Sequence, residues 1–205
     1  MLTIYIVRHG QNEDNANGIL NGHRDLSLTP LGIAQAKNLA IHLRNLGLTF
    51  DKVYTSPLSR AYVTAEIIAD NLGLATPEKH PDLIERNFGV MTGEKIADIE
   101  KLCAPNILKT QVITYFITCP GAETFPELIL RGKRLLADIR TKHANGNILF
   151  VCHGDIGKMI YAAFYGIEWL EALKNFHFGN SEVILLSEMC KPEDAHFYKQ
   201  EQFNH

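Results

Sequence analysis

The hydrophobic positions of this chain fall into two kinds of run that alternate along the sequence. Short, mostly apolar runs cover 2–7, 52–55, 147–152 and 182–186, and another short strand is expected to pair near 196–200. Runs of this length are typical of buried strands, and strands that are apolar on both faces are typical of parallel sheets. The pattern therefore predicts several strands, most of them in one parallel sheet.

Apolar residues spaced three or four apart fill the intervals between these strands. Thr29-Pro30 and Ser56-Pro57 each place a capping residue and a first-turn proline before such a run. These two helices are expected to end at Gly47 and Gly73. The same spacing predicts two more helices, over about 123–143 and 154–163. This alternation predicts an α/β fold, a three-layer α/β/α sandwich with a mostly parallel sheet.

One segment, from about 84 to 122, breaks the alternation. It carries turn signals at Pro105 and Pro120-Gly121 and only a weak helical pattern over 95–103. The chain of 205 residues is long enough to bury a substantial core in one domain. We therefore expect a single domain over 1–205, with a small cap-like insertion at about 84–122.

Composition and charge exclude some classes of binding partner and indicate a cellular compartment. A net charge of −3 gives no reason to expect nucleic acid or an anionic membrane as a partner. No apolar stretch approaches the roughly 20 residues of a membrane-spanning helix. The four cysteines are scattered without zinc-site spacing, and residue 1 leads directly into a strand rather than into a secretory signal. A cytoplasmic protein is expected, and its oligomeric state stays open.

Candidate chemistry gathers where the predicted strands end. Arg8-His9-Gly10 directly follows the first strand, and His153-Gly154 directly follows a later one. Because the carboxyl ends of parallel strands meet at one edge of a sheet, we expect these two histidines to share a site. Arg60 lies one turn into a helix that also follows a strand, although it would equally suit an ordinary helix surface. Arginine binds phosphate oxygens through its planar fork, so the pattern predicts a phosphate site.

A metal site is the alternative interpretation of the same region. It would have to be assembled from His9, His23, Asp25, His153 and Asp155. These residues lack the spacing of known zinc motifs, and the positive charge of Arg8 beside His9 would repel a cation. The sequence therefore predicts no metal and no cofactor.

Five blocks of residues follow one another in order over most of the chain. They are Arg8-His9-Gly10-Gln11 with Asn15, Gly22-x-x-Asp25-x-x-Leu28-Thr29-x-x-Gly32-x-x-Gln35-Ala36, Ser56-Pro57-Leu58-x-Arg60-Ala61-x-x-Thr64-Ala65, Glu85-x-x-Phe88-Gly89-x-x-x-Gly93 and His153-Gly154. In these blocks the chain resembles the histidine phosphatase superfamily, the phosphoglycerate-mutase-like proteins.

The resemblance implies a mechanism and a set of site residues. Neutral His9 would attack phosphorus and form a phosphohistidine that water then hydrolyses. The phosphate would be held by five residues, namely Arg8, Asn15, Arg60, His153 and Gly154, with His153 also counted as catalytic. No metal would be needed, because these groups supply the electrostatic stabilisation.

Glu85 matches the position of the family's general acid, which would protonate the leaving group and later activate water. Glu123 is the rival acid, and a solvated Glu85 paired with Arg86 is the structural alternative. Asp155 departs from the family's usual small residue and is expected to cap the following helix. Gly22 and His23 are candidate substrate contacts.

The family contains both phosphatases and mutases, and the segment after Gly93 decides our choice between them. Cofactor-dependent phosphoglycerate mutases carry a longer insertion there, rich in Trp and Arg, whereas this chain has no Trp between Gly93 and Glu123. A less sealed site favours hydrolysis, so we expect a phosphatase acting on a small phosphorylated metabolite. A phosphoglycerate mutase and a non-catalytic phosphate-binding module stay as alternatives. We expect Phe88, Met91, Tyr115, Phe116 and Phe125 to line the mouth of the site or to form a small core of their own.

Overall fold

A computed structural model describes residues 1–199 of the chain, and six strands of this part form one sheet in the order β3-β2-β6-β1-β7-β8. Their bounds are β1 Leu2–Arg8, β2 Lys52–Thr55, β3 Glu78–Lys79, β6 Gly146–Cys152, β7 Val183–Leu186 and β8 His196–Tyr198. The first four in that order are parallel, whereas β7 and β8 pair antiparallel at one edge. The predicted, mostly parallel sheet is confirmed. The expected pairing at 196–200 is seen over β8, and Gln200 lies outside the described residues.

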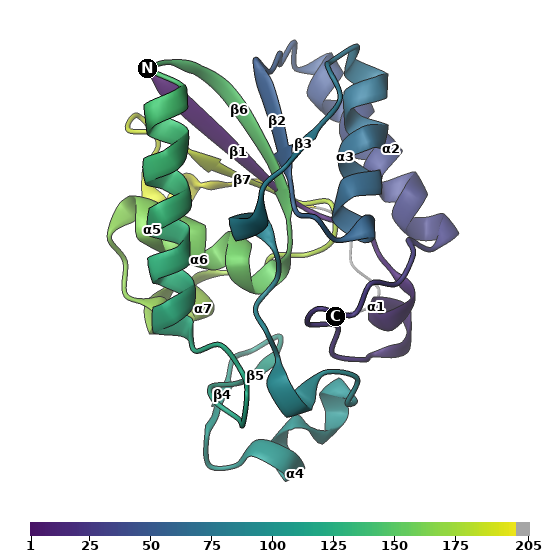
Figure 1. The fold of residues 1–205 in the computed structure, drawn as a ribbon, viewed down its shortest axis with the longest axis vertical. Coiled ribbons are helices and arrows are strands. Elements are labelled where there is room, and N and C mark those ends of the chain that lie inside the picture. The colour runs from purple at the N-terminus through teal and green to yellow at the C-terminus, as the bar shows by residue number, and fades with distance from the viewer. Residues whose placement is uncertain (200–205) are drawn as a thin grey trace.

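Helices cover both faces of this sheet (Figure 1). One face carries α2 (Pro30–Asn45) and α3 (Ser59–Leu72), and the other carries α5 (Phe125–Lys142), α6 (Gly154–Tyr165) and α7 (Trp169–Asn175). Alternate residues of a strand point to opposite faces. Tyr5 and Val7 accordingly pack with α2 and α3, while Ile4 and Ile6 pack with α5 and α6. The predicted three-layer sandwich is confirmed.

The helix starts follow the capping signals in part. Thr29 accepts a hydrogen bond from the Gly32 amide with Pro30 in the first turn, as predicted. The start predicted at Ser56-Pro57 is wrong, because α3 begins at Ser59 and its N-cap is Leu58. Ser56 instead accepts a hydrogen bond from the Leu58 amide in the turn before the helix. That extra turn leaves the serine side chain at the edge of the sheet, where it reaches the site described below.

The segment predicted to be irregular folds into a small layer beyond the carboxyl edge of the sheet (Figure 1). It contains α4 (Ile99–Cys103) and a hairpin of β4 (Ile107–Lys109) and β5 (Thr114–Phe116). Leu20, Phe88, Met91, Ile99, Cys103 and Phe116 form its core. Short 3₁₀ turns cover Pro81–Leu83, Gly89–Met91, Ile96–Asp98 and Pro192–Asp194. The hairpin, α7 and α1 (Glu13–Asn17) are absent from the sequence prediction, because elements this short show no clear period.

Two glycines let the end of β1 approach the first turn of α2. A Cβ atom at Gly10 would lie 2.3 Å from the carbonyl oxygen of Gly32, and one at Gly32 would lie 2.0 Å from that of Gln11. Both positions therefore require glycine, because the atoms in the way belong to the backbone. The close approach that Gly10 permits is that of a helix.

Replacing Gly10 with alanine is expected to lower the free energy of unfolding by about 1–3 kcal/mol, since a rigid overlap must be relieved by backbone movement. Urea unfolding followed by circular dichroism measures the change. Gly73→Ala is the comparison, because Gly73 has a positive φ of 68° but nothing within 4 Å of the added atom, so its loss of stability reports the left-handed backbone alone and no overlap. A Gly10→Ala protein as stable as the wild type would contradict this account.

Within residues 1–199, no helix combines the length and the apolar character that a membrane span requires.

Candidate active site

The two predicted histidines lie together at the carboxyl edge of the sheet. Strands β1 and β6 are parallel neighbours with Arg8 opposite Cys152, so the residues that follow them emerge side by side. The ring centroids of His9 and His153 are 5.1 Å apart. Both side chains are buried, His9 at 2% and His153 at 0% exposure. The topology of the sheet alone therefore brings two imidazoles into one site.

Two contacts determine which nitrogen of His9 carries the proton. Its Nδ1 lies 2.7 Å from the carbonyl oxygen of Gly10, which can only accept, so Nδ1 is the donor. Its Nε2 lies 3.2 Å from Nε of Arg60, which can only donate, so Nε2 carries the lone pair. The carbonyl of Gly10 and the Arg60 side chain thus select the same tautomer. A nucleophilic nitrogen is held in a fixed direction next to a guanidinium.

Burial keeps both imidazoles neutral. The pKa of His9 falls well below its usual value because the ring is desolvated and the positive charges of Arg60 and Arg8 lie close by. The pKa of His153 falls for the same reasons, desolvation first. Ser56, the residue whose predicted cap was wrong, is hydrogen-bonded through Oγ to Nε2 of His153 at 2.8 Å. At neutral pH the His9 lone pair is therefore available for reaction.

Two arginines surround this imidazole pair. Arg60 is 1% exposed, and its Nη atoms donate to the carbonyl oxygens of Arg24 at 2.5 Å and Gly22 at 3.0 Å. Burial lowers the Arg60 pKa to about 10, so the side chain stays charged at neutral pH. Arg8 donates through Nη1 to the carbonyl oxygen of Phe178 at 2.6 Å, while its buried Nε has no hydrogen-bond partner among the described residues. Unused guanidinium donors beside a neutral histidine suit a phosphoryl group.

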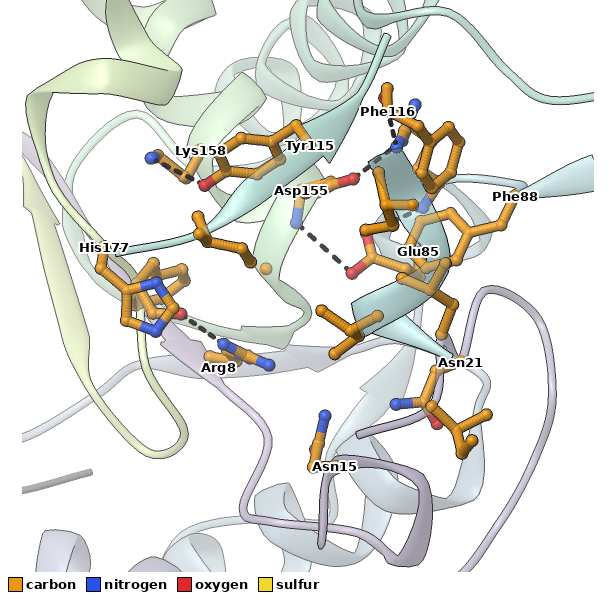
Figure 2. Close-up of a pocket in the computed structure, with 18 of the residues that line it drawn as sticks. Arg8, Asn15, Asn21, Glu85, Phe88, Tyr115, Phe116, Asp155, Lys158 and His177 are labelled. Atoms are coloured by element: carbon orange, nitrogen blue, oxygen red, sulfur yellow. Dashed lines mark hydrogen bonds and ion pairs between the residues drawn. The ribbon is translucent and has the colours of Figure 1, made fainter. Parts of the chain in front are cut away.

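A pocket of about 780 Å³, counted out to its open mouth, lies in front of these groups. Figure 2 shows its wall, with Arg8 from the end of β1, Asn15 from α1, and Phe88, Tyr115 and Phe116 from the small layer. Of the other residues that we expected at the mouth, Met91 lies in the core of that layer and Phe125 in the main core. The pocket is therefore formed between the carboxyl edge of the sheet and the segment predicted as a cap.

Glu85 lies in the pocket wall at the N-terminus of α6 and is 6% exposed. Its carboxylate accepts hydrogen bonds from the amides of Arg86 at 2.8 Å and Ile156 at 3.1 Å. Burial raises its pKa above the ordinary value, and the negative charge of Asp155 adds to the increase, while the amide contacts oppose it. The expectation of a solvated Glu85 paired with the Arg86 side chain does not describe this structure. A buried carboxyl with a raised pKa is suited to holding a proton.

Asp155 forms an ion pair rather than a helix cap. The N-cap of α6 is His153, whose side chain makes no capping hydrogen bond, and the carboxylate that accepts from the amides of this helix end is that of Glu85. The capping role predicted for Asp155 is therefore wrong. Asp155 instead contacts Nε of Arg86 at 2.7 Å. The Arg86 guanidinium lies 4.1 Å from the ring centre of Phe116 and 4.2 Å from that of Phe125. The positive charge of Arg86 and the negative charge of Asp155 therefore neutralise each other within the pocket wall.

The remaining predicted residues lie in different places. Asn15 lines the pocket, and its Oδ1 accepts from Nδ2 of Asn180 at 3.3 Å. Gly22 and His23 do not belong to the pocket wall. Their contacts support it from behind, because Gly22 holds Arg60 and Nε2 of His23 donates to the Glu85 carbonyl oxygen at 2.8 Å. Gly154 lines the pocket next to Arg8.

Glu123, the rival acid, is engaged elsewhere. Its carboxylate forms an ion pair with Arg131 at 2.7 Å, outside the wall of the pocket that holds His9. Through residue 199, no three His, Cys, Asp or Glu side chains gather in a way that could hold a metal ion.

Comparison with known proteins agrees with this geometry. The family model described as histidine phosphatase superfamily (branch 1) matches residues 4–191. The chain belongs to the histidine phosphatase superfamily.

Relatives of this chain include proteins of two activities. It is 36% identical to a candidate phosphoserine phosphatase of Hydrogenobacter thermophilus, over 89% of this chain and 88% of that protein. It is 32% identical to a 2,3-bisphosphoglycerate-dependent phosphoglycerate mutase of Brucella melitensis, over 84% of this chain and 85% of that protein. Among solved structures, it is similar to a phosphoserine phosphatase of Entamoeba histolytica in complex with 3-phosphoglyceric acid, with a TM-score of 0.73, 26% identity and 90% of each chain covered.

Several polar residues of the site could not be predicted from the sequence. Lys158 and Arg86 line the pocket, while Ser56 and Asn180 contact His153 and Asn15. Helical spacing gave one usable signal, because Lys158 lies one turn after Gly154 on the same face of α6. The other three depend on tertiary contacts between segments far apart in the sequence.

Proposed function

We propose that this chain is a phosphomonoesterase that hydrolyses a small phosphorylated metabolite through a phosphohistidine on Nε2 of His9. The proposal rests chiefly on one observation, the tautomer of His9. A neutral imidazole with its lone pair on the pocket side, next to the buried Arg60 and the half-buried Arg8, is what attack on a phosphoryl group needs. The names of the phosphatase relatives support the same activity.

In this mechanism the phosphoryl oxygens of the substrate take the donors of Arg8, Arg60 and His153, with Asn15 and the Gly154 amide beside them. Arg60 exchanges its contact with His9 for a phosphoryl oxygen, which frees the Nε2 lone pair. The bond from Nε2 to phosphorus then forms in line as the ester bond to the leaving oxygen breaks. The arginines stabilise the charge that spreads over the equatorial oxygens in the transition state.

Glu85 acts as the general acid and then as the general base. Its carboxyl proton passes to the leaving alkoxide, which departs as the alcohol. The resulting carboxylate takes a proton from water while the water oxygen attacks phosphorus and the bond to His9 breaks. Inorganic phosphate leaves, and both His9 and the protonated Glu85 are restored. The pKa of Glu85, raised by burial, supports its protonated state at the start of the cycle.

A mutase is the second candidate, and the Brucella relative favours it. A mutase would return the phosphoryl group from His9 to the sugar acid instead of to water. We favour the phosphatase because the segment between Gly93 and Glu123 is short and contains no Trp. A non-catalytic binding module would not need the oriented lone pair of His9.

Incubation with 3-phosphoglycerate is expected to release inorganic phosphate and glycerate without forming 2-phosphoglycerate. Phosphorus NMR distinguishes the three phosphorus species in one tube. The same reaction in excess chelator should proceed at the same rate, since the proposed charge stabilisation comes from side chains. Accumulation of 2-phosphoglycerate would favour the mutase, and loss of activity in chelator would rule out the metal-independent mechanism.

The proposal also includes the domain organisation of the chain and its cellular compartment. We treat residues 1–205 as one domain in which the segment at about 84–122 caps the pocket, supported by the contribution of Phe88, Tyr115 and Phe116 to its wall. We keep the cytoplasm as the proposed compartment.

A further inference from the structure

One cation in the pocket wall has no role in the proposed chemistry. Lys158 lies in α6 and is 2% exposed, and it lines the same pocket as His9. Its ammonium donates to the carbonyl oxygen of Leu173 at 2.9 Å and to that of Phe176, and it lies 3.4 Å from the hydroxyl of Tyr115. In the part of the chain that the structure describes, no carboxylate forms an ion pair with it. A buried ammonium without a counter-charge is costly and is commonly retained for binding.

The charges of the pocket wall leave Lys158 in excess. The wall contains four cations, Arg8, Arg60, Arg86 and Lys158, and two carboxyl groups, Glu85 and Asp155. Asp155 neutralises Arg86 in their ion pair at 2.7 Å. Arg8 and Arg60 match the two charges of a phosphate monoester dianion. Burial lowers the pKa of Lys158 to about 7, so an anion bound beside it would favour its charged form. With Glu85 protonated and Asp155 paired, no group of the wall supplies that anion when only a phosphoryl group is bound.

Tyr115 places a hydrogen-bond donor between this charge and the pocket. Because its oxygen accepts from Lys158, its own proton is free to point into the pocket. Figure 2 shows the two side chains joined by a dashed line on the side of the pocket away from Asn15. Burial raises the pKa of Tyr115, so the hydroxyl stays a donor at neutral pH. Tyr115 comes from the β5 strand of the cap and Lys158 from α6, so both layers contribute to this part of the wall.

The spacing along α6 fits a short substrate. Gly154 adjoins the Arg8 guanidinium, and Lys158 follows it by one helical turn on the same face. Four residues of an α-helix rise by about 6 Å. This rise corresponds to a substrate with a phosphate and a second anionic group at the two ends of a chain of about three carbons.

We propose that Tyr115 and Lys158 form a second anion subsite, which binds a carboxylate carried by the phosphorylated substrate. The Tyr115 hydroxyl donates to the carboxylate, and the Lys158 ammonium behind it neutralises the charge. The natural substrate is then a small phosphomonoester of a carboxylic acid. This inference rests on the proposed function for its phosphoryl site and adds what the rest of the substrate must be.

Matched esters with and without the carboxylate test the subsite. The pairs are 3-phosphoglycerate with glycerol 3-phosphate and phosphoserine with phosphoethanolamine. A hydrogen bond to a charged group predicts that the wild type prefers the carboxylate ester by roughly 10- to 100-fold in kcat/KM, mainly through KM. Tyr115→Phe keeps the ring and removes only the hydroxyl, and it should reduce the preference toward one. Lys158→Met should do the same.

Tyr165→Phe is the control, since its hydroxyl donates to Leu185 at 3.3 Å and does not line the pocket. If Lys158→Met fails to fold because two carbonyls lose their partner, Tyr115→Phe decides the test. Equal use of both esters by the wild type overturns the proposal, as does a preference that survives Tyr115→Phe.

Calorimetry on the inactive His9→Ala protein separates this inference from the proposed function. Tighter binding of 3-phosphoglycerate than of glycerol 3-phosphate, lost on adding Tyr115→Phe, supports the subsite whether or not the wild type hydrolyses either ester. Absence of hydrolysis of every ester by the wild type would overturn the phosphatase alone. Equal binding of the two esters would overturn the subsite alone.

Discussion

Replacing His9 with alanine is expected to lower phosphate release by more than about 10³-fold, because the side chain that attacks the ester in the proposed mechanism is removed. The same change should abolish the covalent intermediate. Wild-type protein quenched in alkali during turnover of a ³²P-labelled ester should carry label, since a phosphorus–nitrogen bond of this kind is stable in base and labile in acid. The His9→Ala protein should carry none. Gel electrophoresis of the quenched protein measures both.

His42→Ala is the matched control for this experiment. His42 lies in α2, stacked on Tyr198 with ring centroids 4.3 Å apart, and does not line the pocket. Its removal should leave both turnover and labelling unchanged. Label retained on the His9→Ala protein, or found on a peptide without His9 after digestion, would contradict the assigned nucleophile.

The pocket-forming strands could be predicted from the sequence because they are local and strongly patterned. A mostly apolar run leads to His-Gly at His9, with Arg8 in between, and directly at His153. Parallel strands necessarily present their carboxyl ends at one edge. Arg60 was placed by the same reasoning, since its helix follows a strand. The fold class and the grouping of these three residues follow from pattern and topology alone.

The rest of the site depends on contacts that no local pattern encodes. Asp155 was expected to cap α6 because it lies in the first turn of the helix, but Arg86 competes for its carboxylate and offers a buried ion pair. Ser56 was expected to cap α3, but its hydroxyl is taken up by the turn before the helix and by His153. Short polar side chains near helix starts have several partners within reach, and tertiary packing selects among them.

The secondary structure of the hairpin in the cap could not be predicted from a local sequence pattern either. Strands β4 and β5 have three residues each, too few for alternation to be distinguished from chance. Their pairing is stabilised by the core that Phe116 shares with Phe88 and Met91. Tyr115 is the middle residue of β5, and its side chain lies on the opposite face of the hairpin from that of Phe116. Because the sequence does not predict the hairpin, it could suggest that Tyr115 lies near the mouth of the site but not which residue it contacts.

Replacing Glu85 with glutamine is expected to slow hydrolysis of an alkyl phosphate by roughly 10²- to 10⁴-fold, the contribution of a general acid. Glutamine keeps the size and the acceptor oxygen for the Ile156 amide but cannot donate a proton to the leaving alkoxide. An aryl phosphate such as p-nitrophenyl phosphate has a leaving group that needs no proton, so its turnover should fall far less. The measurement is kcat/KM for both esters with the wild type and the variant.

The pH dependence gives the same prediction an independent readout. Burial and the charge of Asp155 raise the pKa of Glu85, so the group holds its proton to a higher pH than an exposed glutamate does. For the alkyl ester, kcat/KM of the wild type should therefore fall as the pH rises through that raised pKa and the proton is lost. In Glu85→Gln the part of this alkaline limb that Glu85 contributes should disappear, because glutamine does not titrate. Glu123→Gln is the control, since Glu123 pairs with Arg131 outside the pocket. Equal losses on both esters in Glu85→Gln, or a selective alkyl-ester loss in Glu123→Gln, would assign the acid to another residue.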